Sequence, residues 1–579
     1  MRHIKLLPGL LLVSLFFTFS ATAQQKNFPT VRDRKAVEQL KKSGDFVSLQ
    51  KSFKIAQQAD NPLSDLAKFD TVGQLLTFEW RRESSMTSSD GMADDLFGYS
   101  VAIAGNTAIV GSVGNDVGAN DDQGSAYIFV HSGNSWTQQA KLIAGDGAAH
   151  DNFGRSVAID GDTAIVGTTG DVGSSDNQGK AYVFVRSGTG WTQQAMLTAD
   201  DGTAQDFFGT SVAISGNTVV IGANFDDVGA NADQGSAYIF VRSESRWSQQ
   251  AKLTADSGAA FDNLGNCVAI SGGTVIVGAY FADVGGNANQ GSAYIFVRSD
   301  DRWIQEAQFT ASTALFGNSV AIDGDTAVVG VFGDDIGANP NQGSAYVYAR
   351  SGSGWMQQAH LTAADGEANA NFGKSVGVSG DTIVVGANSD DVGANANQGS
   401  AYIFNRADSI WTERKKLIDN DGAAIDNFGI SAAVSDNKVV VGSFSRDIEM
   451  SLTLDGTGNT GNVGVNQGAA VFFVAAPQQL PTISISGRIT DLHRRAIGAA
   501  TVTATDSQGA TFTTFVKMNG GFNFGNMLAG ATYTINVYAR RYRFLPQIVN
   551  SNTNLSNVNF VGNYTNSDLS VRLAEARTE

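Results

Sequence analysis

The sequence predicts an all-β protein, a seven-bladed β-propeller closed by an N-terminal strand and followed by a small β-sandwich. Three observations support this prediction: a unit of about 55 residues recurs seven times, each unit contains strand-like pieces, and seven tryptophans recur with the same period as the units. Each copy of such a unit buries its apolar surface against its neighbours. The Phe-Gly mark of the unit falls at Phe97, Phe153, Phe208, Leu264 (as Leu-Gly), Phe316, Phe372 and Phe428.

Each unit contains four candidate strands separated by turn residues. In the third unit these are residues 211–214, 218–222, 236–241 and 247–253, which are rich in Val, Ile, Phe, Tyr and Trp. Gly, Asn and Asp occupy the connections, so the four pieces form an antiparallel meander. Several meanders arranged around an axis make a propeller.

The position of the first tryptophan predicts how the ring closes. Trp80 lies 17 residues before Phe97, the spacing found in most later units, so a Trp strand precedes the first complete unit. The last unit, residues 429–474, ends without a Trp strand. We therefore expect the segment around Trp80 to supply the missing outer strand of the seventh blade, which removes an exposed sheet edge.

The chain outside residues 76–476 has a different character. Residues 1–23 have a basic start, an apolar run and an Ala-Thr-Ala cleavage site, as in an export signal. Residues 24–75 are polar with two amphipathic helical candidates, residues 477–562 show alternating strands of a small sandwich, and residues 563–579 form a tail. The single cysteine, Cys267, replaces a repeated Ser, and we expect it to be a small buried substitute.

The motifs Phe-Gly-x-Ser-Val-Ala-Ile, Val-Val-x-Gly-Ala and Gly-Ser-Ala-Tyr-Ile-Phe resemble FG-GAP repeats, the units of the integrin alpha-chain propeller. The Trp-Thr-Gln-Gln-Ala ending is similar to a bacterial extracellular branch of that family. This resemblance implies a propeller outside the cell that serves adhesion or ligand binding. The integrin calcium loop is absent, because only a tight turn, as at Gly380-Asp381, joins the first two strands. Residues 477–562 resemble a carboxypeptidase regulatory-like (transthyretin-like) module, which implies a noncatalytic accessory domain.

The charged residues are unevenly distributed over the predicted propeller. The net charge of −17 argues against nucleic acid and anionic membranes as partners. The long loops and the loops between Trp strand and Phe-Gly mark share one face and hold 31 of the 56 acidic residues. We expect this acidic face to bind cations, a basic protein or a polar glycan. The opposite face carries Arg186, Arg242, Arg246, Arg298, Arg302, Arg350 and Arg406.

The long loops offer a candidate calcium site. In the third unit, Asp227, Asn231 and Asp233 could supply oxygen ligands to Ca²⁺. The alternative is that these side chains cap tight turns by bonding their own backbone. Six long loops share an Asp-Val-Gly or Asp-Ile-Gly core. Its first residue in the successive loops is Asp116, Asp171, Asp227, Asp283, Asp335 and Asp391.

The sequence favours a noncatalytic binding or adhesion scaffold over an enzyme. The five histidines occupy unrelated repeat positions, and no nucleophile–base spacing, metal-binding His pair or phosphate loop is present. A carbohydrate-active propeller enzyme using loop carboxylates, or a Ca²⁺-stabilised surface scaffold, are the alternatives. We expect no cofactor, a secreted, cell-surface or periplasmic monomer without a membrane span after signal removal, and an extracellular protein or glycan as partner. Residues 451–467 interrupt only the last long loop and are a candidate partner-binding element.

Overall fold

The computed structural model describes residues 78–173, 175–312, 315–352, 354–448, 465–477, 482–506, 511–528, 531–550 and 553–564. The predicted export signal, the segment 24–75, nearly all of the loop 451–467 and the C-terminal tail from residue 565 lie outside the described residues. The chain divides into two compact units, one spanning Phe78–Pro477 and one that includes the strands after Gln478. All elements in the described ranges are strands. Within those ranges, nothing helical has the length and apolarity that a membrane crossing requires.

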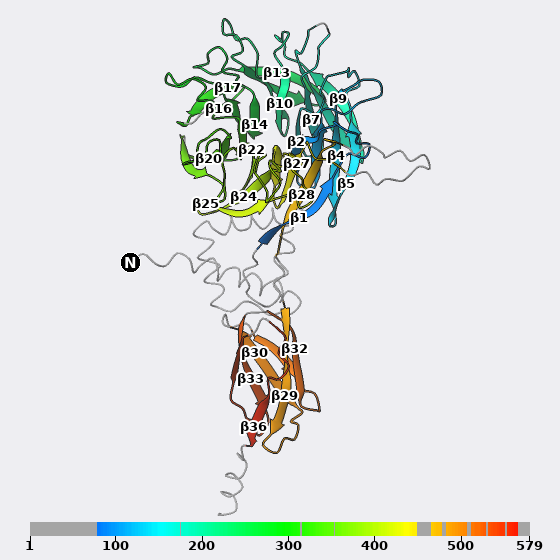
Figure 1. Cartoon of the computed structure of the whole chain (residues 1–579), viewed down its shortest axis with the longest axis vertical. Coiled ribbons are helices and arrows are strands. Elements are labelled where there is room, and N and C mark those ends of the chain that lie inside the picture. Colours follow the sequence, from blue (N-terminus) through cyan, green and yellow to red (C-terminus); the bar gives the residue numbers. More distant parts are fainter. Residues whose placement is uncertain are drawn as a thin grey trace, which may run out of the picture. The chain divides into compact units, whose positions relative to one another are not determined.

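The unit Phe78–Pro477 is a ring of seven four-stranded antiparallel sheets, so the prediction of an all-β, seven-bladed propeller is confirmed (Figure 1). Blades 1 to 3 consist of β2 (Phe97–Ala104), β3 (Thr107–Ser112), β4 (Ser125–Ser132) and β5 (Ser135–Leu142); β6 (Ser156–Asp160), β7 (Thr163–Thr168), β8 (Lys180–Ser187) and β9 (Gly190–Leu197); and β10 (Phe208–Ser215), β11 (Thr218–Ala223), β12 (Ser236–Ser243) and β13 (Arg246–Leu253). Blades 4 to 6 consist of β14 (Cys267–Ser271), β15 (Thr274–Ala279), β16 (Ser292–Ser299) and β17 (Arg302–Phe309); β18 (Ser319–Asp323), β19 (Thr326–Val331), β20 (Ser344–Ser351) and β21 (Gly354–Leu361); and β22 (Phe372–Ser379), β23 (Thr382–Ala387), β24 (Ser400–Ala407) and β25 (Ile410–Leu417).

The seventh blade joins the two ends of the propeller. Its order is β1 (Phe78–Met86), β28 (Ala469–Pro477), β27 (Lys438–Ser443) and β26 (Ser431–Ser435). β1 pairs antiparallel with β28, from Phe78 opposite Pro477 to Met86 opposite Ala470. The predicted closure by an N-terminal strand is therefore confirmed, and the pairing covers the free edge of β28.

Each Phe-Gly mark builds the core between two blades. Phe208 is fully buried and lies edge-on to Tyr238 and Phe240 of its own blade. The same cluster contains Ile165 and Val183 of the preceding blade. Every blade therefore buries its apolar surface only against its neighbours, as the repeat pattern predicted.

The tryptophans of the outer strands also join neighbouring blades. The indole N–H of Trp191 donates to Gln139 Oε1 of the preceding blade at 2.9 Å. An equivalent bond to a Gln or Glu of the preceding blade is present at five further tryptophans: Trp136, Trp247, Trp303, Trp355 and Trp411.

A ring of hydrogen bonds runs through the first strands of all seven blades. The Ser211 hydroxyl donates to the carbonyl of Gly265 in the next blade at 2.7 Å. In blade 4 the Cys267 thiol takes the hydroxyl's place and donates to Gly317 O at 3.2 Å, and burial raises the pKa of this thiol to about 12. Cys267 is thus a structural substitute for Ser, as expected. The remaining donors are Ser100, Ser156, Ser319, Ser375 and Ser431, the last of which bonds Gly98 and completes the circle.

The second unit is a small β structure of its own. Its strands are β29 (Thr482–Asp491), β30 (Ala500–Asp506), β31 (Thr511–Phe515), β32 (Gly521–Leu528), β33 (Thr532–Ala539), β34 (Tyr542–Arg543), β35 (Gln547–Asn550) and β36 (Phe560–Tyr564). They form one eight-stranded sheet in the order β31-β30-β33-β34-β36-β29-β32, with β35 on β33. Ile485, Val502, Phe524 and Ile535 lie in its apolar core. This arrangement is consistent with the predicted sandwich.

Candidate functional site

One end of the propeller is built from two kinds of loop, and we call it the long-loop face. The first kind joins the second and third strands of a blade, and the second joins the fourth strand to the next blade. Backbone bonds hold them side by side: His150 N donates to Asp121 O, and Phe153 N donates to Gln123 O. The predicted placement of both loop types on one face is therefore confirmed.

The leading Asp of each long loop caps the backbone of its own loop. Asp227 Oδ1 accepts the Asp233 N–H at 2.9 Å. An equivalent bond recurs in every blade, because a short carboxylate reaches a backbone donor at the end of the same loop. The carboxylate lies six residues before the donor in the first six blades, as for Asp227, and 19 residues before it in blade 7. The other six acceptors are Asp116, Asp171, Asp283, Asp335, Asp391 and Asp447.

The second residue of the calcium candidate also has a local role. Asn231 Nδ2 donates to Gln234 Oε1 at 2.8 Å and to Gly258 O at 3.3 Å, which ties the long loop to the following connection. Asp233 adopts a left-handed backbone with φ of 51°. The structure thus brings Asp227, Asn231 and Asp233 together in one loop and engages the first two in turn bonds. In the part of the chain that the structure describes, no group of three or more His, Cys, Asp or Glu residues could hold a metal ion. Calcium binding by this trio stays a prediction.

Beneath the long-loop face lies an ion network that we did not derive from the sequence. In blade 3, Lys252 Nζ of β13 lies 2.7 Å from both Asp201 and Asp226, and the Tyr238 hydroxyl donates to Asp201 at 2.9 Å. Burial alone would raise the pKa of Asp201, but the hydrogen bonds from Lys252 and Tyr238 lower it. The same four-residue arrangement recurs in blade 6 with Lys416, Asp365, Asp390 and Tyr402. The recurring Lys before the last Leu of the Trp strand was the available sequence signal.

A different network closes the ring in blade 7. Arg446 Nη1 lies 2.6 Å from Asp419, whose side chain is only 1% exposed, and also donates to Ser85 Oγ of β1. Arg82 of β1 contacts Asp419 at 3.1 Å and Asp421 at 2.6 Å. The closing strand is therefore bound to the long-loop face by ion pairs as well as by its backbone.

Several of the arginines predicted for the opposite face are engaged in contacts within the propeller. The Arg242 guanidinium lies 5.2 Å from the Trp247 ring centre and donates to Thr163 of the preceding blade. Arg186 pairs with Asp162 and Arg406 with Asp381. These arginines hold neighbouring blades together, because a guanidinium can stack on an aromatic ring and still donate in its plane.

The comparison with family models explains the repeat. The FG-GAP repeat model matches residues 80–129, 136–184, 191–240, 247–296, 303–348, 355–404 and 411–463, more than half of the chain. The protein belongs to the FG-GAP repeat family. No curated protein matches it.

The FG-GAP unit and the blade are out of phase. Each matched FG-GAP segment begins at the Trp of one blade's outer strand. The first six segments end in the third strand of the next blade, and the seventh ends at residue 463, before β28. One sequence repeat therefore spans a junction between blades, and the first must begin with the strand that completes the last blade. This phase difference is the physical reason for closure by β1.

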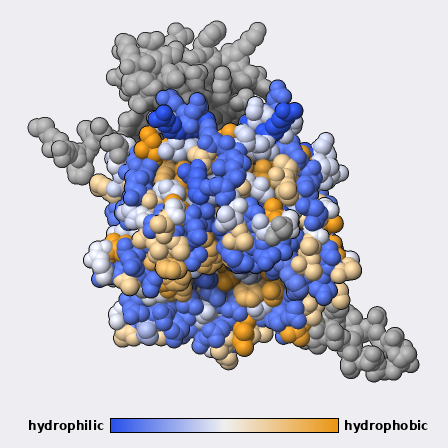
Figure 2. Space-filling model, turned by 90° about the horizontal axis from the view of Figure 1, so that it is seen from above, coloured by the Kyte–Doolittle hydropathy of each residue, from blue (hydrophilic) through white to orange (hydrophobic). Residues whose placement is uncertain are grey.

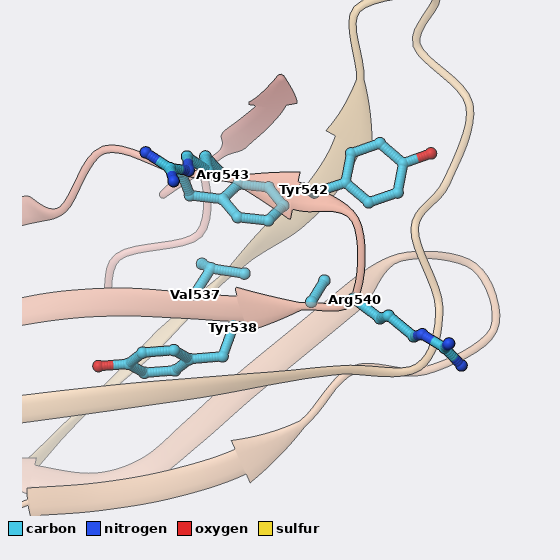
Figure 3. Close-up of a pocket in the computed structure, with 7 residues that line it drawn as sticks. Val537, Tyr538, Arg540, Tyr542 and Arg543 are labelled. Carbon is cyan, nitrogen blue, oxygen red and sulfur yellow. The ribbon is translucent and has the colours of Figure 1, made fainter. Parts of the chain in front are cut away.

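The C-terminal unit carries a separate open cavity of about 470 Å³, lined by residues of β33, β34 and their connection. Val537 and Phe544 contribute apolar surface, and Arg540 and Arg543 contribute charge. The two arginine side chains point in opposite directions (Figure 3). They do not converge on one ligand group, so this cavity shows no formed anion site.

Proposed function

We propose that this FG-GAP protein is an exported, noncatalytic binding scaffold that engages a protein or glycan partner through the long-loop face. FG-GAP propellers commonly serve as extracellular binding scaffolds. The export pattern of residues 1–23 supports secretion or display at the cell surface. We further propose that the C-terminal unit is a carboxypeptidase regulatory-like module of the bacterial extracellular branch, supported by its strand pattern, and that it acts as a spacer or second contact.

The charge of the propeller is the observation that carries this proposal. Residues 78–477 contain 45 Asp or Glu and 19 Lys or Arg. The capping carboxylates such as Asp227 are exposed at the surface while they accept a bond from the backbone. A concentrated negative field of this kind accelerates and orients the approach of a complementary partner.

The surface composition points to polar recognition. In the view of Figure 2, hydrophilic residues cover most of the described surface, and hydrophobic residues form small separate groups. Exposed large apolar side chains such as Met92 and Phe261 are scattered along the chain. A partner that is a polar glycan or a basic protein segment matches such a surface better than an apolar peptide does.

The test is to neutralise exposed carboxylates that make no side-chain bond within the described residues. One variant carries Asn at the four long-loop-face positions, and a matched variant is changed at four exposed acids of the opposite face. Wild-type protein is first screened on an array of neutral, acidic and basic glycans and basic peptides, and both variants are then titrated with the best ligand. We expect the first variant to lose binding and the second to keep it; equal behaviour contradicts the proposal. The two sets are Asp121, Asp176, Asp200 and Asp256, and Glu244, Asp300, Asp408 and Asp436.

The calcium-stabilised scaffold has a separate test. The seven capping loops each place a carboxylate at the surface, and this repetition favours a cation there over one at scattered positions. If Ca²⁺ binds Asp227 and its equivalents, added Ca²⁺ raises the melting temperature and EDTA lowers it. A melting temperature that neither reagent moves contradicts calcium binding.

A further inference from the structure

The two units of the chain carry net charges of opposite sign. Residues 78–477 contain 45 Asp or Glu and 19 Lys or Arg, whereas residues 482–564 contain two Asp or Glu and seven Lys or Arg. The net charge of the whole chain, −17, therefore describes the propeller and conceals a basic C-terminal unit. Exposed charges separated by more than about 8 Å are largely screened at physiological ionic strength, so each surface acts through its own local charge.

All seven cations of the C-terminal unit lie at one end of its strands. Three connections meet there: residues 492–499 after β29, residues 516–520 after β31 and residues 540–541 after β33. The antiparallel register aligns these strand ends, because the first residue of β30 lies opposite the last residue of β33. We call this end the basic end. Its cations are Arg488, Arg494, Arg495, Lys517, Arg540, Arg541 and Arg543, and all of them are exposed.

The connections of the basic end contact one another. The Val516 N–H donates to the carbonyl of Ala500 at 3.0 Å, which ties the connection after β31 to the start of β30. A Cβ placed on Gly498 would lie 3.5 Å from Met518 Cα, so the connections after β29 and β31 lie side by side. The cations are therefore carried by one continuous surface.

Acidic residues neutralise little of this charge. The two acids between residues 482 and 564 are Asp491 and Asp506. Asp491 pairs with Arg495 at 2.8 Å and also accepts the His493 N–H, so its carboxylate is used within its own turn. Asp506 is the last residue of β30 and so lies at the other end of that strand. The basic end therefore keeps a surplus of positive charge.

Four large apolar or aromatic side chains are exposed at the basic end as well. Two of them stand in the connections, where Met518 is 97% exposed and Leu492 is 68% exposed. The other two, Phe515 and Tyr538, are also exposed and lie on either side of Thr501, one residue from the start of β30. Exposed apolar side chains gathered in one place mark an interaction site.

Cations and protruding apolar side chains together favour a lipid surface over a soluble polyanion. A polyanion such as nucleic acid is bound through its charges by Lys and Arg and needs no apolar contact. An anionic bilayer uses both features, because its headgroups attract cations and its headgroup–acyl boundary accepts apolar and aromatic side chains. Arg540 and Arg543 point in opposite directions (Figure 3), so they can contact separate headgroups spread over a plane.

We propose that the basic end of the C-terminal unit docks on a membrane surface rich in anionic lipid, with its cations at the headgroups and Leu492 and Met518 inserted among them. This inference goes beyond the proposed function, because it concerns the C-terminal unit and makes no use of the long-loop face. The acidic propeller is repelled by the same lipids, so the basic end is the part that docks. Such docking retains an exported chain at a membrane through a peripheral contact.

The test is flotation of the full chain with increasing amounts of vesicles, made either of phosphatidylcholine alone or of phosphatidylcholine and phosphatidylglycerol in equal parts. The charge variant combines Lys517→Gln with Arg540→Gln, and the apolar variant combines Leu492→Ser with Met518→Ser. The matched controls make the same kinds of change at exposed positions of the propeller: Arg246→Gln with Arg302→Gln, and Met356→Ser with Ile410→Ser.

We expect wild type to bind the anionic vesicles and not the neutral ones, and to bind them more weakly as salt is raised. Each basic-end variant should bind the anionic vesicles at least about tenfold more weakly, and both controls should bind like wild type. The first control changes the net charge as much as the charge variant does, so it separates a local effect from a general one. Melting temperatures establish that each variant is folded, and the other basic-end variant decides if one does not fold.

Several outcomes overturn the proposal. Equal binding to both kinds of vesicle, binding to neither, or unchanged binding by both folded basic-end variants contradicts docking on anionic lipid. Weaker binding by the charge variant, with full binding by the apolar variant, contradicts insertion and indicates a site for soluble polyanions. A wild-type dimer that the charge variant dissolves in size-exclusion chromatography, without vesicle binding, indicates that the acidic propeller of a second copy is the occupant.

Failure of this proposal is distinguishable from failure of the proposed function. The long-loop variant changed at Asp121, Asp176, Asp200 and Asp256 should bind anionic vesicles at least as well as wild type, because it removes negative charge from the propeller. If the vesicles are not bound but the same variant loses a glycan or peptide ligand, membrane docking is wrong and the long-loop face stands. If vesicle binding depends on the basic end while the long-loop carboxylates affect no ligand, the proposed function is wrong and membrane docking stands.

Discussion

In blades 3 and 7, the contact between the outer strand and the long loop is made by charged residues placed in opposite order. In blade 3 the cation, Lys252, stands on the outer strand and the loop supplies Asp226. In blade 7 the loop supplies the cation, Arg446, and the outer strand has Ser85. The positions are equivalent, because Lys252 pairs with Tyr238 and Ser85 with Val471, and because Asp226 O and Arg446 O both accept the N–H of the Gly that precedes the third strand.

In both blades a half-buried cation is paired with a buried carboxylate, but the residue types at the equivalent positions differ. Asp419 is the added carboxylate of blade 7, and the equivalent position in blade 3 is Ala199. The exchanged polarity gives the closing strand its own ion network, because Arg82 and Ser85 of β1 contact Asp419 and Arg446 of blade 7. Buried ion pairs are better attested as devices for register than as sources of stability.

The largest effect should come from removing the closing strand. A chain shortened to begin after Met86 loses β1, exposes the edge of β28, and leaves Asp419 without Arg82 and Trp136 without its acceptor Glu83. We expect loss of cooperative unfolding and aggregation, because an open edge strand templates pairing with other chains. Size-exclusion chromatography and denaturant unfolding measure this, with a chain that begins at Phe78 as the control. A monomeric, cooperatively folded protein without β1 contradicts closure as the basis of the fold.

The second prediction converts the closure junction into the blade 3 type. Arg446→Asp should lower the free energy of unfolding by about 3–5 kcal/mol, because it leaves Asp419 with one fewer cation and adds a buried carboxylate. Adding Ser85→Lys and Asp419→Ala supplies the charges of blade 3 and should restore at least about half of that loss. Urea unfolding of the single and triple variants gives the coupling. No recovery in the triple variant shows that the two junctions are not equivalent.

The third prediction uses the natural variation of blade 2, where Met196 holds the Lys252 position and Gly170 holds the Asp226 position. Lys252→Met alone leaves Asp226, which is 3% exposed, without its cation and should cost about 3 kcal/mol of unfolding free energy. Adding Asp226→Gly should recover part of this loss, because the unpaired carboxylate is removed with its partner. The measurement is the urea midpoint at constant slope. If the double variant has a lower free energy of unfolding than Lys252→Met alone, the charge-balance argument is contradicted.

The repeats made the fold predictable, and the ion networks show where prediction from sequence ended. The Phe-Gly marks and the position of Trp80 identified seven blades and the closing strand, because both patterns report local pairing. Asp227 could be assigned to turn capping as one alternative, since the bond lies within one loop. Lys252 and Arg446 act between segments about 25 to 360 residues apart, and a single copy of the sequence does not show which charges meet.

The smallest and most selective effect concerns pH. Burial, as the largest cause, raises the pKa of Asp426 from 3.8 to about 6, although its carboxylate accepts the Ala423 N–H at 2.8 Å. Between about pH 4 and pH 6 the folded state therefore retains a proton that the unfolded state has released, so the free energy of unfolding falls as pH rises through this interval. Asp426→Asn keeps the acceptor and removes the titration. Relative to wild type, this variant should gain on the order of 2 kcal/mol between pH 4 and pH 7.

Asp201 provides the control of opposite sign. Burial opposes ionisation there, but hydrogen bonds from Lys252 and Tyr238 prevail and lower its pKa, so the ionised form stabilises the folded state above about pH 4 and that stability is lost on acidification. Asp201→Asn should therefore lose stability relative to wild type as pH rises from 3 to 6, while Asp426→Asn gains. Asp201 and Asp426 lie in equivalent loops, the first between β9 and β10 and the second between β25 and β26. Urea unfolding of both variants across this pH range distinguishes an aspartate with a lowered pKa from one with a raised pKa. Parallel pH profiles for the two variants would show that the Lys252 junction, and with it the contrast with blade 7, does not control the protonation of the long-loop face.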